Sequence, residues 1–224
     1  MERHFEHELE GLRTSLIKMG TMVEESFRLA VKAVVEHDRS AAQGAVVADE
    51  RIDMLELEID NAIIDLLALQ QPVAKDLRFI IASQKLNNDL ERIGDHAVNI
   101  AQSALTLAEL SGTASMGEIT QMLGIVGRML RDALDAFIRL DSVLAEEVLQ
   151  VEDRVDDLNR SMAKTVIGAI KANAMSIETG MELARISRNL ERVADLSTNI
   201  SEEVVFLAQA RVIKHHAEAH RSQC

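Results

Sequence analysis

The sequence predicts an all-α fold built from two tandem three-helix bundles, and three observations support this. The chain has one Pro and ten Gly in 224 residues, too few turn signals for an all-β protein. Apolar residues recur at alternating spacings of three and four, the pattern of amphipathic helices. A motif also returns after 100 residues, as NDLERIGDHAVNIA at 88–101 and RNLERVADLSTNIS at 188–201. The chain therefore uses one helical unit twice.

Two further segments repeat in the same order as the long motif. The segment DERID at 49–53 returns as EDRVD at 152–156, an offset of 103. At that same offset, VKAVVEHDRS at 31–40 runs beside LDAFIRLDSV at 134–143. We place the first unit at 1–112 and the second at 113–213. The best linker between them is the segment 111–115, and residues 214–224 are expected to form a flexible tail.

The first unit is predicted to contain helices at about 5–37, 40–69 and 74–110. Asp38 is the N-cap candidate of the second helix, and Pro72 ends that helix and lets the third begin. Each helix has an apolar seam that would face its partners. In the third helix the seam residues are Leu86, Leu90, Ile93, Ala97, Ile100, Ala104 and Leu107.

The second unit is predicted to repeat this plan, with helices at about 115–139, 142–172 and 177–213. Asp141 is the N-cap candidate equivalent to Asp38, and Asn173 is expected to mark the stop before the last helix. Short loops between antiparallel helices give a three-helix bundle in each unit.

Charge and composition exclude several classes of protein. The net charge of −13 disfavours binding to nucleic acid through a phosphate-neutralising face. The single cysteine, Cys224, allows no intrachain disulfide, which fits a reducing compartment. No apolar run approaches the roughly 18 residues of a membrane span, and the first residues have no apolar segment typical of a signal peptide. We expect a cytoplasmic protein whose membrane contact, if any, is peripheral.

The candidate functional residues are pairs of carboxylates at helical i, i+4 spacing. They are Asp49, Asp53, Glu91 and Asp95 in the first unit, and Glu152, Asp156, Glu191 and Asp195 in the second. One interpretation is a solvated face, because acidic pairs are ordinary on helix surfaces. The other is a metal site, because crowded like charges are destabilising and a cation would remove that cost. Hard oxygen ligands suit Mg, Mn, Ca or Fe.

The second unit is the poorer copy of this arrangement. Asn159 and Ala163 stand where the first unit has Glu56 and Asp60, and Arg188 replaces Asn88. An arginine beside carboxylates can take the place of a cation by forming an ion pair. The second site is therefore expected to be weaker or structural.

Three other features near these motifs have competing interpretations. Gly94 lies between Glu91 and Asp95 in a helix, where it allows close helix packing or leaves room for an ion, and packing is favoured. His96 could be a ligand, but Leu196 takes its place in the second unit, which favours an ordinary, partly exposed histidine. The histidines of the tail, at 215, 216 and 220, are expected to be disordered rather than to bind metal.

No arrangement typical of an enzyme emerges from the sequence. The chain lacks a phosphate-binding P-loop, a G-x-S-x-G elbow and an H-E-x-x-H metalloprotease motif. His96 follows Glu91 by five residues, which does not fit the Glu-x-x-His spacing of di-iron carboxylate proteins. We therefore expect a protein that is not an enzyme. The alternative is a metal-dependent phosphohydrolase that uses the same carboxylates.

The segment LNNDLERIGDHAVNIA at 86–101, with DERID and EDRVD upstream of the two long motifs, resembles the PhoU family. The resemblance covers essentially the whole chain and implies two tandem three-helix bundles. It implies metal clusters, of Mn, Mg, Fe or Zn, on the eight carboxylates named above. Leu196 and Ser197 depart from the family's usual His-Ala, which puts the second site in doubt.

The same resemblance implies a function and partners. Members of the PhoU family are cytosolic, often homodimeric, and associate with membrane proteins. They link a phosphate ABC transporter, through its ATPase subunit, to a PhoR-type sensor histidine kinase. When phosphate is plentiful they restrain phosphate uptake and keep the phosphate-starvation response off. We expect this chain to be such a negative regulator.

Overall fold

The computed structural model describes residues 2–70, 72, 74–110 and 117–211, and these fold into seven α-helices. The first unit comprises α1 (Glu2–Glu36), α2 (Arg39–Gln70) and α3 (Ala74–Glu109). The second comprises α4 (Gly117–Arg139), α5 (Ser142–Leu149), α6 (Glu152–Lys171) and α7 (Ile177–Gln209). The predicted linker, the boundary between the units and the predicted tail lie outside the described residues.

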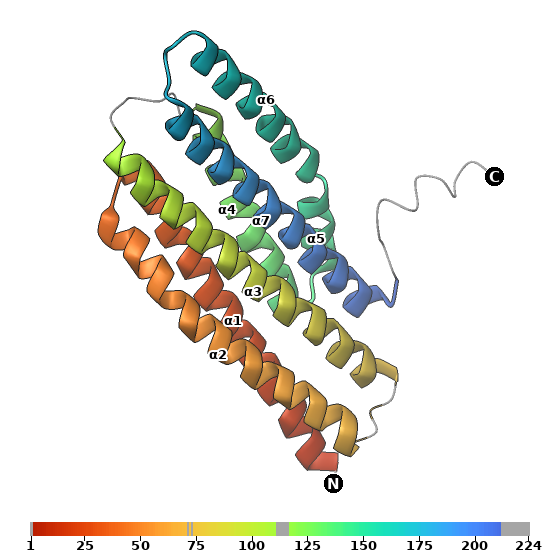
Figure 1. The fold of residues 1–224 in the computed structure, drawn as a ribbon. Helices are drawn as coiled ribbons and strands as arrows, with labels where there is room; N and C mark the ends of the chain where they lie inside the picture. The colour runs from red at the N-terminus through yellow and green to blue at the C-terminus, as the bar shows by residue number, and fades with distance from the viewer. Residues whose placement is uncertain (1, 71, 73, 111–116, 212–224) are drawn as a thin grey trace, which may run out of the picture.

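The helices form two packed layers (Figure 1). In one layer α2, α3, α7 and α6 lie side by side, and α1 and α4 cover the other face. The two central helices, α3 and α7, run antiparallel and join the two units, and α1 also contacts α4. Since α3 and α7 are equivalent helices of the repeat, the units face one another across an approximate two-fold relation. The predicted all-α fold of two tandem bundles is confirmed.

A single apolar core runs through both units and confirms the predicted seams. In α3 the residues Leu86, Leu90, Ile93, Ala97, Ile100 and Ala104 are all buried. In α2 the seam residues Ile52, Leu55 and Ile59 are buried as well. The carboxylates beside these seams are thereby held at fixed positions along rigid helices.

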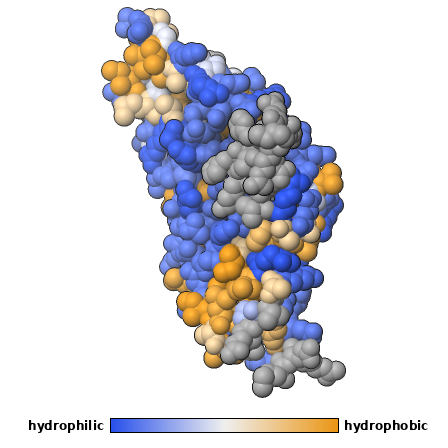
Figure 2. Space-filling model, turned by 90° about the vertical axis from the view of Figure 1, so that its right-hand side faces the viewer, coloured by the Kyte–Doolittle hydropathy of each residue, from blue (hydrophilic) through white to orange (hydrophobic). Residues whose placement is uncertain are grey.

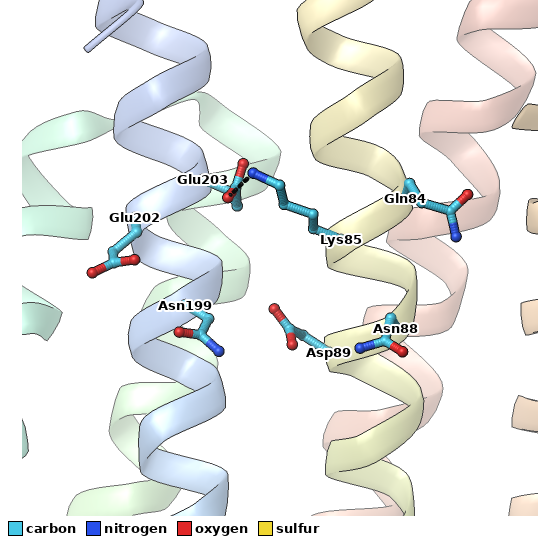
Figure 3. A pocket seen from close by; sticks show the side chains of 7 residues that line it. All are labelled: Gln84, Lys85, Asn88, Asp89, Asn199, Glu202 and Glu203. Carbon is cyan, nitrogen blue, oxygen red and sulfur yellow. Dashed lines mark hydrogen bonds and ion pairs between the residues drawn. The ribbon is translucent and has the colours of Figure 1, made fainter. Parts of the chain in front are cut away.

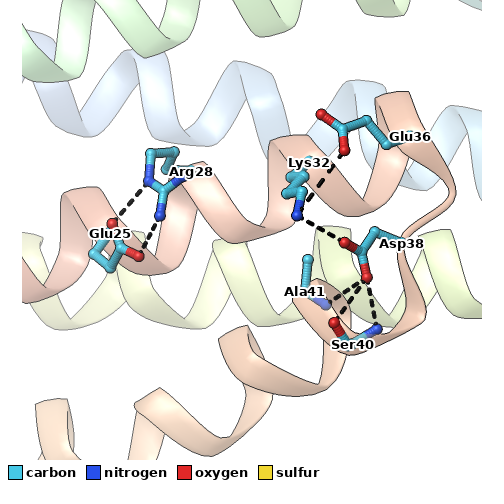
Figure 4. A network of polar contacts seen from close by, with 7 residues as sticks. All are labelled: Glu25, Arg28, Lys32, Glu36, Asp38, Ser40 and Ala41. Atoms are coloured by element: carbon cyan, nitrogen blue, oxygen red, sulfur yellow. Dashed lines mark hydrogen bonds and ion pairs between the residues drawn. The ribbon is translucent and has the colours of Figure 1, made fainter.

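The start of α2 shows how side chains fix a helix end (Figure 4). Asp38 Oδ1 accepts hydrogen bonds from the backbone N–H groups of Ser40, at 2.9 Å, and Ala41, at 3.1 Å. Lys32 Nζ lies 2.8 Å from Asp38 Oδ2. The hydrogen bond from Lys32, and then those from the capped backbone, hold the pKa of Asp38 well below its usual range. Asp38 is therefore the predicted N-cap.

The start of α5 repeats this geometry 103 residues later. Asp141 Oδ1 accepts from the N–H groups of Val143, at 3.0 Å, and Leu144, at 3.2 Å. The residues before the two caps, His37 and Leu140, both have positive φ angles, of 54° and 52°. This left-handed conformation costs an L-residue on the order of 1 kcal/mol, and it lets the chain reverse direction at each of the two turns. The repeat therefore extends to the backbone angles of its turns.

The predicted single helix at 142–172 is wrong, because a turn at Gln150 and Val151 divides it into α5 and α6. Their N–H groups bond three residues back, to Glu147 at 3.3 Å and Val148 at 3.1 Å, instead of four. No Pro or Gly marks this break in the sequence. As a result α6 begins at Glu152, whereas the equivalent α2 passes through its carboxylates without interruption.

One other predicted feature is present. After α6, Asn173 adopts a φ of 54° and stops the helix, as predicted. In the described part of the chain, no helix is both long enough and apolar enough to span a membrane.

Candidate functional site

Six carboxylates gather where α2 and α3 pack together, and we call them the first cluster. They are Asp49, Asp53, Glu56 and Asp60 of α2 with Glu91 and Asp95 of α3. Gly94 lies at a close approach of the two helices, since a Cβ there would lie 3.3 Å from Ile52 Cδ1. The same Cβ would lie 3.7 Å from Asp49 Oδ1. Ile52 packing against Gly94 supports the interpretation of this glycine as a packing residue.

Mutual repulsion shapes the electrostatics of the first cluster. Partial burial, and then the charges of Asp95, Glu56, Asp53 and Asp49, raise the pKa of Glu91 to about 7. Burial and neighbouring carboxylates likewise raise the pKa values of Glu56 and Asp49.

A countercharge is missing from the first cluster. Among the described residues, no Lys, Arg or His forms an ion pair with any of its six members. The side-chain donors that reach it from the described residues are amides: Gln84 Nε2 and Asn87 Nδ2 donate to Asp60 Oδ1 at 2.9 and 2.7 Å. Amides stabilise a carboxylate but do not neutralise it. The first cluster is therefore a concentration of negative charge.

Arginines accompany the carboxylates of the second cluster, which comprises Glu152, Asp156, Glu191 and Asp195 on α6 and α7. Ion pairs between described residues of this cluster are Arg188 Nη1 to Glu191 Oε2 at 3.4 Å, Arg192 Nη1 to Asp195 Oδ2 at 2.8 Å, and Arg160 Nη1 to Asp156 Oδ2 at 4.0 Å. Burial still raises the pKa of Asp195, and Arg192 opposes that rise.

Arg188 takes the role that the sequence predicted, an ion pair beside the second set of carboxylates. Arg160 and Arg192 were missed, although the sequence contains the signal for both. They lie at i+4 from Asp156 and at i−3 from Asp195, spacings that place charges side by side on a helix. The two clusters thus share a backbone plan and differ in charge.

The residues of the first cluster fit a metal by their chemistry, since they are hard oxygen donors without a countercharge. Their arrangement is not preassembled, because the described residues contain no group of three or more His, Cys, Asp or Glu side chains placed to hold an ion. Binding would require the side chains of α2 and α3 to converge. The second cluster fits a metal less well, because its arginines already supply positive charge.

His96 belongs to the contact between the units and not to the first cluster. Its Nδ1 lies 2.8 Å from Asn189 Oδ1 on α7. The side chain is half-buried, and burial lowers its pKa. The prediction of a partly exposed histidine is correct, but its partner on the second unit could not be read from the sequence.

A groove between α3 and α7 was also missed, and we call it the inter-unit groove (Figure 3). It encloses about 410 Å³ and is lined by Gln84, Lys85, Asn88, Asp89, Asn199, Glu202 and Glu203. Burial raises the pKa of Asp89 to about 6, and Arg92 and a hydrogen bond from Asn199 oppose that rise. The groove forms where two helices far apart in the sequence pack together, so no local sequence pattern predicts it.

The sequence is similar to those of known proteins over almost the whole chain. A family model described as the PhoU domain matches residues 16–104 and 119–204, one match in each unit. A phosphate-specific transport system accessory protein, PhoU homolog, of Pseudomonas putida is 37% identical over 217 residues, which are 96% of this chain and 84% of that protein. The homolog of the same name in Aquifex aeolicus is 34% identical over 208 residues, covering 93% and 94%.

Solved structures agree with these relatives. PhoU from Pseudomonas aeruginosa superposes with a TM-score of 0.89 at 34% identity, covering 92% of this chain and 100% of that one. The phosphate transport system regulatory protein PhoU from Streptococcus pneumoniae gives a TM-score of 0.85 at 31% identity, covering 94% and 99%.

Proposed function

Because the chain belongs to the PhoU family, we propose that it is a negative regulator of phosphate uptake and of the phosphate-starvation response. The observation that supports this most directly is the match of both helical units to the PhoU domain. Relatives that align with more than nine-tenths of the chain are named accessory proteins of phosphate-specific transport, and a structural neighbour is named a regulatory protein. A role in the regulation of phosphate transport follows.

We propose that the chain performs this role as an adaptor. Its partners are the ATPase subunit of a phosphate ABC transporter and a PhoR-type sensor histidine kinase, and it acts in the cytoplasm as a homodimer. The proposal is supported by the names of the relatives, which describe accessory and regulatory proteins and not enzymes. The net charge of −13 disfavours direct docking on anionic lipid, so membrane association would pass through protein contacts.

The first cluster is the proposed metal site. Asp49, Asp53, Glu91 and Asp95 would hold Mn, Mg, Fe or Zn, and the metal would supply the positive charge that the cluster lacks. The second cluster, in which arginines take up much of that charge, would bind metal weakly or serve as a structural contact. A double variant Asp53→Ala with Glu91→Ala should lose more bound metal than the matched double variant Asp156→Ala with Glu191→Ala, as measured by elemental analysis.

The adaptor role is tested by deletion and by co-purification. Deleting the gene should switch on phosphate-starvation genes in phosphate-rich medium while the transporter still assembles. The wild-type protein should co-purify from membranes with the ATPase subunit or the kinase. Normal repression in the deletion strain would contradict the proposal, as would binding to protein-free anionic liposomes as tight as to native membranes.

A separate measurement distinguishes an adaptor from a metal-dependent phosphohydrolase. The purified protein is incubated with a generic phosphate ester and added Mn or Mg. An adaptor gives no turnover above that of the Asp53→Ala, Glu91→Ala variant. Turnover that disappears in this variant would assign the first cluster to catalysis.

A further inference from the structure

The inter-unit groove contains a buried carboxylate that is only half satisfied. Lys85 Nζ lies 2.6 Å from Glu203 Oε1, and its ammonium also lies 5.8 Å from the Phe206 ring centroid. Glu203 is only 7% exposed, and its second oxygen, Oε2, is buried without a hydrogen-bond partner. A buried carboxylate oxygen without a donor is costly, so this atom points to a missing partner.

A second buried carboxylate lies across the groove, one helical turn from the first pair. Asp89 of α3 is 8% exposed and faces Asn199 of α7 (Figure 3). Its nearest ion-pair partner is Arg92 Nη1, at 3.8 Å. Asp89 and Glu203 thus bring two buried carboxylates into a lining in which Lys85 is the basic residue. The groove therefore favours a cation.

In the other half of the α3–α7 contact, an arginine stands where the groove has Lys85. An offset of 100 converts Lys85 to Arg185 and Asn199 to Asn99. Arg185 Nη2 donates to Asn99 Oδ1 at 2.9 Å and lies 3.5 Å from Gln102 Oε1. A guanidinium group thus reaches across the helix pair in that half.

The groove differs from its counterpart in the residues that would receive such a group. At the same offset, Asp89 and Glu203 are converted to Asn189 and Ser103, so both buried carboxylates belong to the groove alone. The half with Arg185 has neutral acceptors, and the half with Lys85 has charged ones. Charged acceptors bind a guanidinium more strongly than amides do.

We propose that the inter-unit groove binds a guanidinium group supplied from outside the chain, with Glu203 and Asp89 as its acceptors. A planar guanidinium presents donors on several edges, enough for both carboxylates, whereas the single ammonium of Lys85 is held at Glu203 Oε1. A metal ion is the weaker alternative, because the groove is not among the arrangements that could hold one within the described residues. The proposal depends neither on the regulatory role nor on the first cluster.

Nuclear magnetic resonance titration of the full chain at pH 8 tests the proposal. The probes are an arginine blocked as acetyl and methylamide, agmatine, and the blocked lysine and citrulline. The backbone amides of 84–89 and 199–203 should shift and saturate with the guanidinium probes. The uncharged citrulline and the lysine should bind at least about 10-fold more weakly, a difference of one charged hydrogen-bonded contact. Tighter binding of the blocked arginine would indicate a protein side chain as the source, and tighter binding of agmatine a small molecule.

Three variants of groove residues, with one control variant outside the groove, make the assignment specific. Glu203→Gln should weaken binding of the guanidinium probe by about 10-fold or more, while Glu58→Gln, the same charge change on the exposed side of α2, should not. Lys85→Met should strengthen binding several-fold, because it removes the cation that competes for Glu203. Asp89→Asn is the second weakening variant, and Asn189 shows that an amide packs at the equivalent position.

Several outcomes would overturn the proposal. They are shifts that do not saturate, equal binding of citrulline or lysine, and affinity unchanged in both Glu203→Gln and Asp89→Asn. Weaker binding in Lys85→Met would show that the lysine is part of the site, which also contradicts the proposed competition. Circular dichroism of each variant confirms that it is folded.

Discussion

Replacing Glu91 by Gln should stabilise the protein when metal is absent. The neutral amide has nearly the same shape as the carboxyl group but removes the charge that its neighbours repel. Because the pKa of Glu91 is raised to about 7 from its ordinary 4.5, the folded state holds this proton more tightly than the unfolded state does. The free energy of unfolding of the wild type therefore falls as pH rises from about 4.5 to about 7.

The size of this effect follows from the same pKa. For a fully buried group, the difference would correspond to roughly 3 kcal/mol at pH 8. Glu91 is partly exposed, so solvent screening reduces the expected gain of Glu91→Gln to about 1 kcal/mol. At pH 4, where the wild-type carboxyl is protonated in both states, the gain should vanish.

Urea unfolding at pH 4, 6 and 8, in buffer with a chelator, measures the gain directly. Urea is preferred because guanidinium chloride would screen the repulsion. The matched control is Glu191→Gln, which removes a charge that Arg188 partners at 3.4 Å and should lower stability at pH 8. Changes of the same sign for the two variants at pH 8, or a gain independent of pH, would refute the proposed difference between the clusters.

Three further predictions concern stability. Saturating Mn or Mg should raise the melting temperature of the wild type, by the equivalent of about 2.7 kcal/mol at 100-fold excess over Kd. The rise should be absent in the double variant Asp53→Ala with Glu91→Ala. Equal rises for the two proteins in calorimetry would exclude the first cluster as the metal site. Gly180→Ala should lower the free energy of unfolding in urea by about 1 kcal/mol, because its Cβ would lie 2.8 Å from side chains of α6. Gly124→Ala, at an exposed position in α4, should raise the free energy of unfolding by about 1 kcal/mol. Asp141→Ala should cost about 1 kcal/mol by loss of the N-cap of α5, and an unchanged midpoint would contradict that role.

Much of the fold could be predicted because its determinants are local. The buried seam of α3 and the caps at Asp38 and Asp141 depend on residues within a few turns of one another. The turn that divides α5 from α6 could not be predicted, since neither Gln150 nor Val151 is a residue that breaks helices. Helix propensity alone does not oppose a continuous helix here, so the sequence carries no local signal for the break.

The candidate site also has features that could be predicted from the sequence and features that could not. Carboxylates at i, i+4 spacing on α2 and α3 could be found from the motifs, and Arg188 could be anticipated as a countercharge. The contact of His96 with Asn189 and the groove beside Asp89 could not be predicted, because they depend on how closely α3 and α7 pack, and these helices lie 100 residues apart in the sequence. Sequence patterns describe the faces of helices, but they do not say which helix of another unit lies against each face.

The position of α7 has a consequence for how the chain is made. It is the last of the described helices to be synthesised, and it contacts α3 of the first unit as well as α4, α5 and α6 of its own. Domains begin to fold while synthesis continues, so α1, α2 and α3 can pack before α7 leaves the ribosome. During that interval Asp89, His96 and Asn99, which later contact α7, face water. Their polarity would keep this face of α3 hydrated until α7 is made, so that the first unit would expose less apolar surface in the interval.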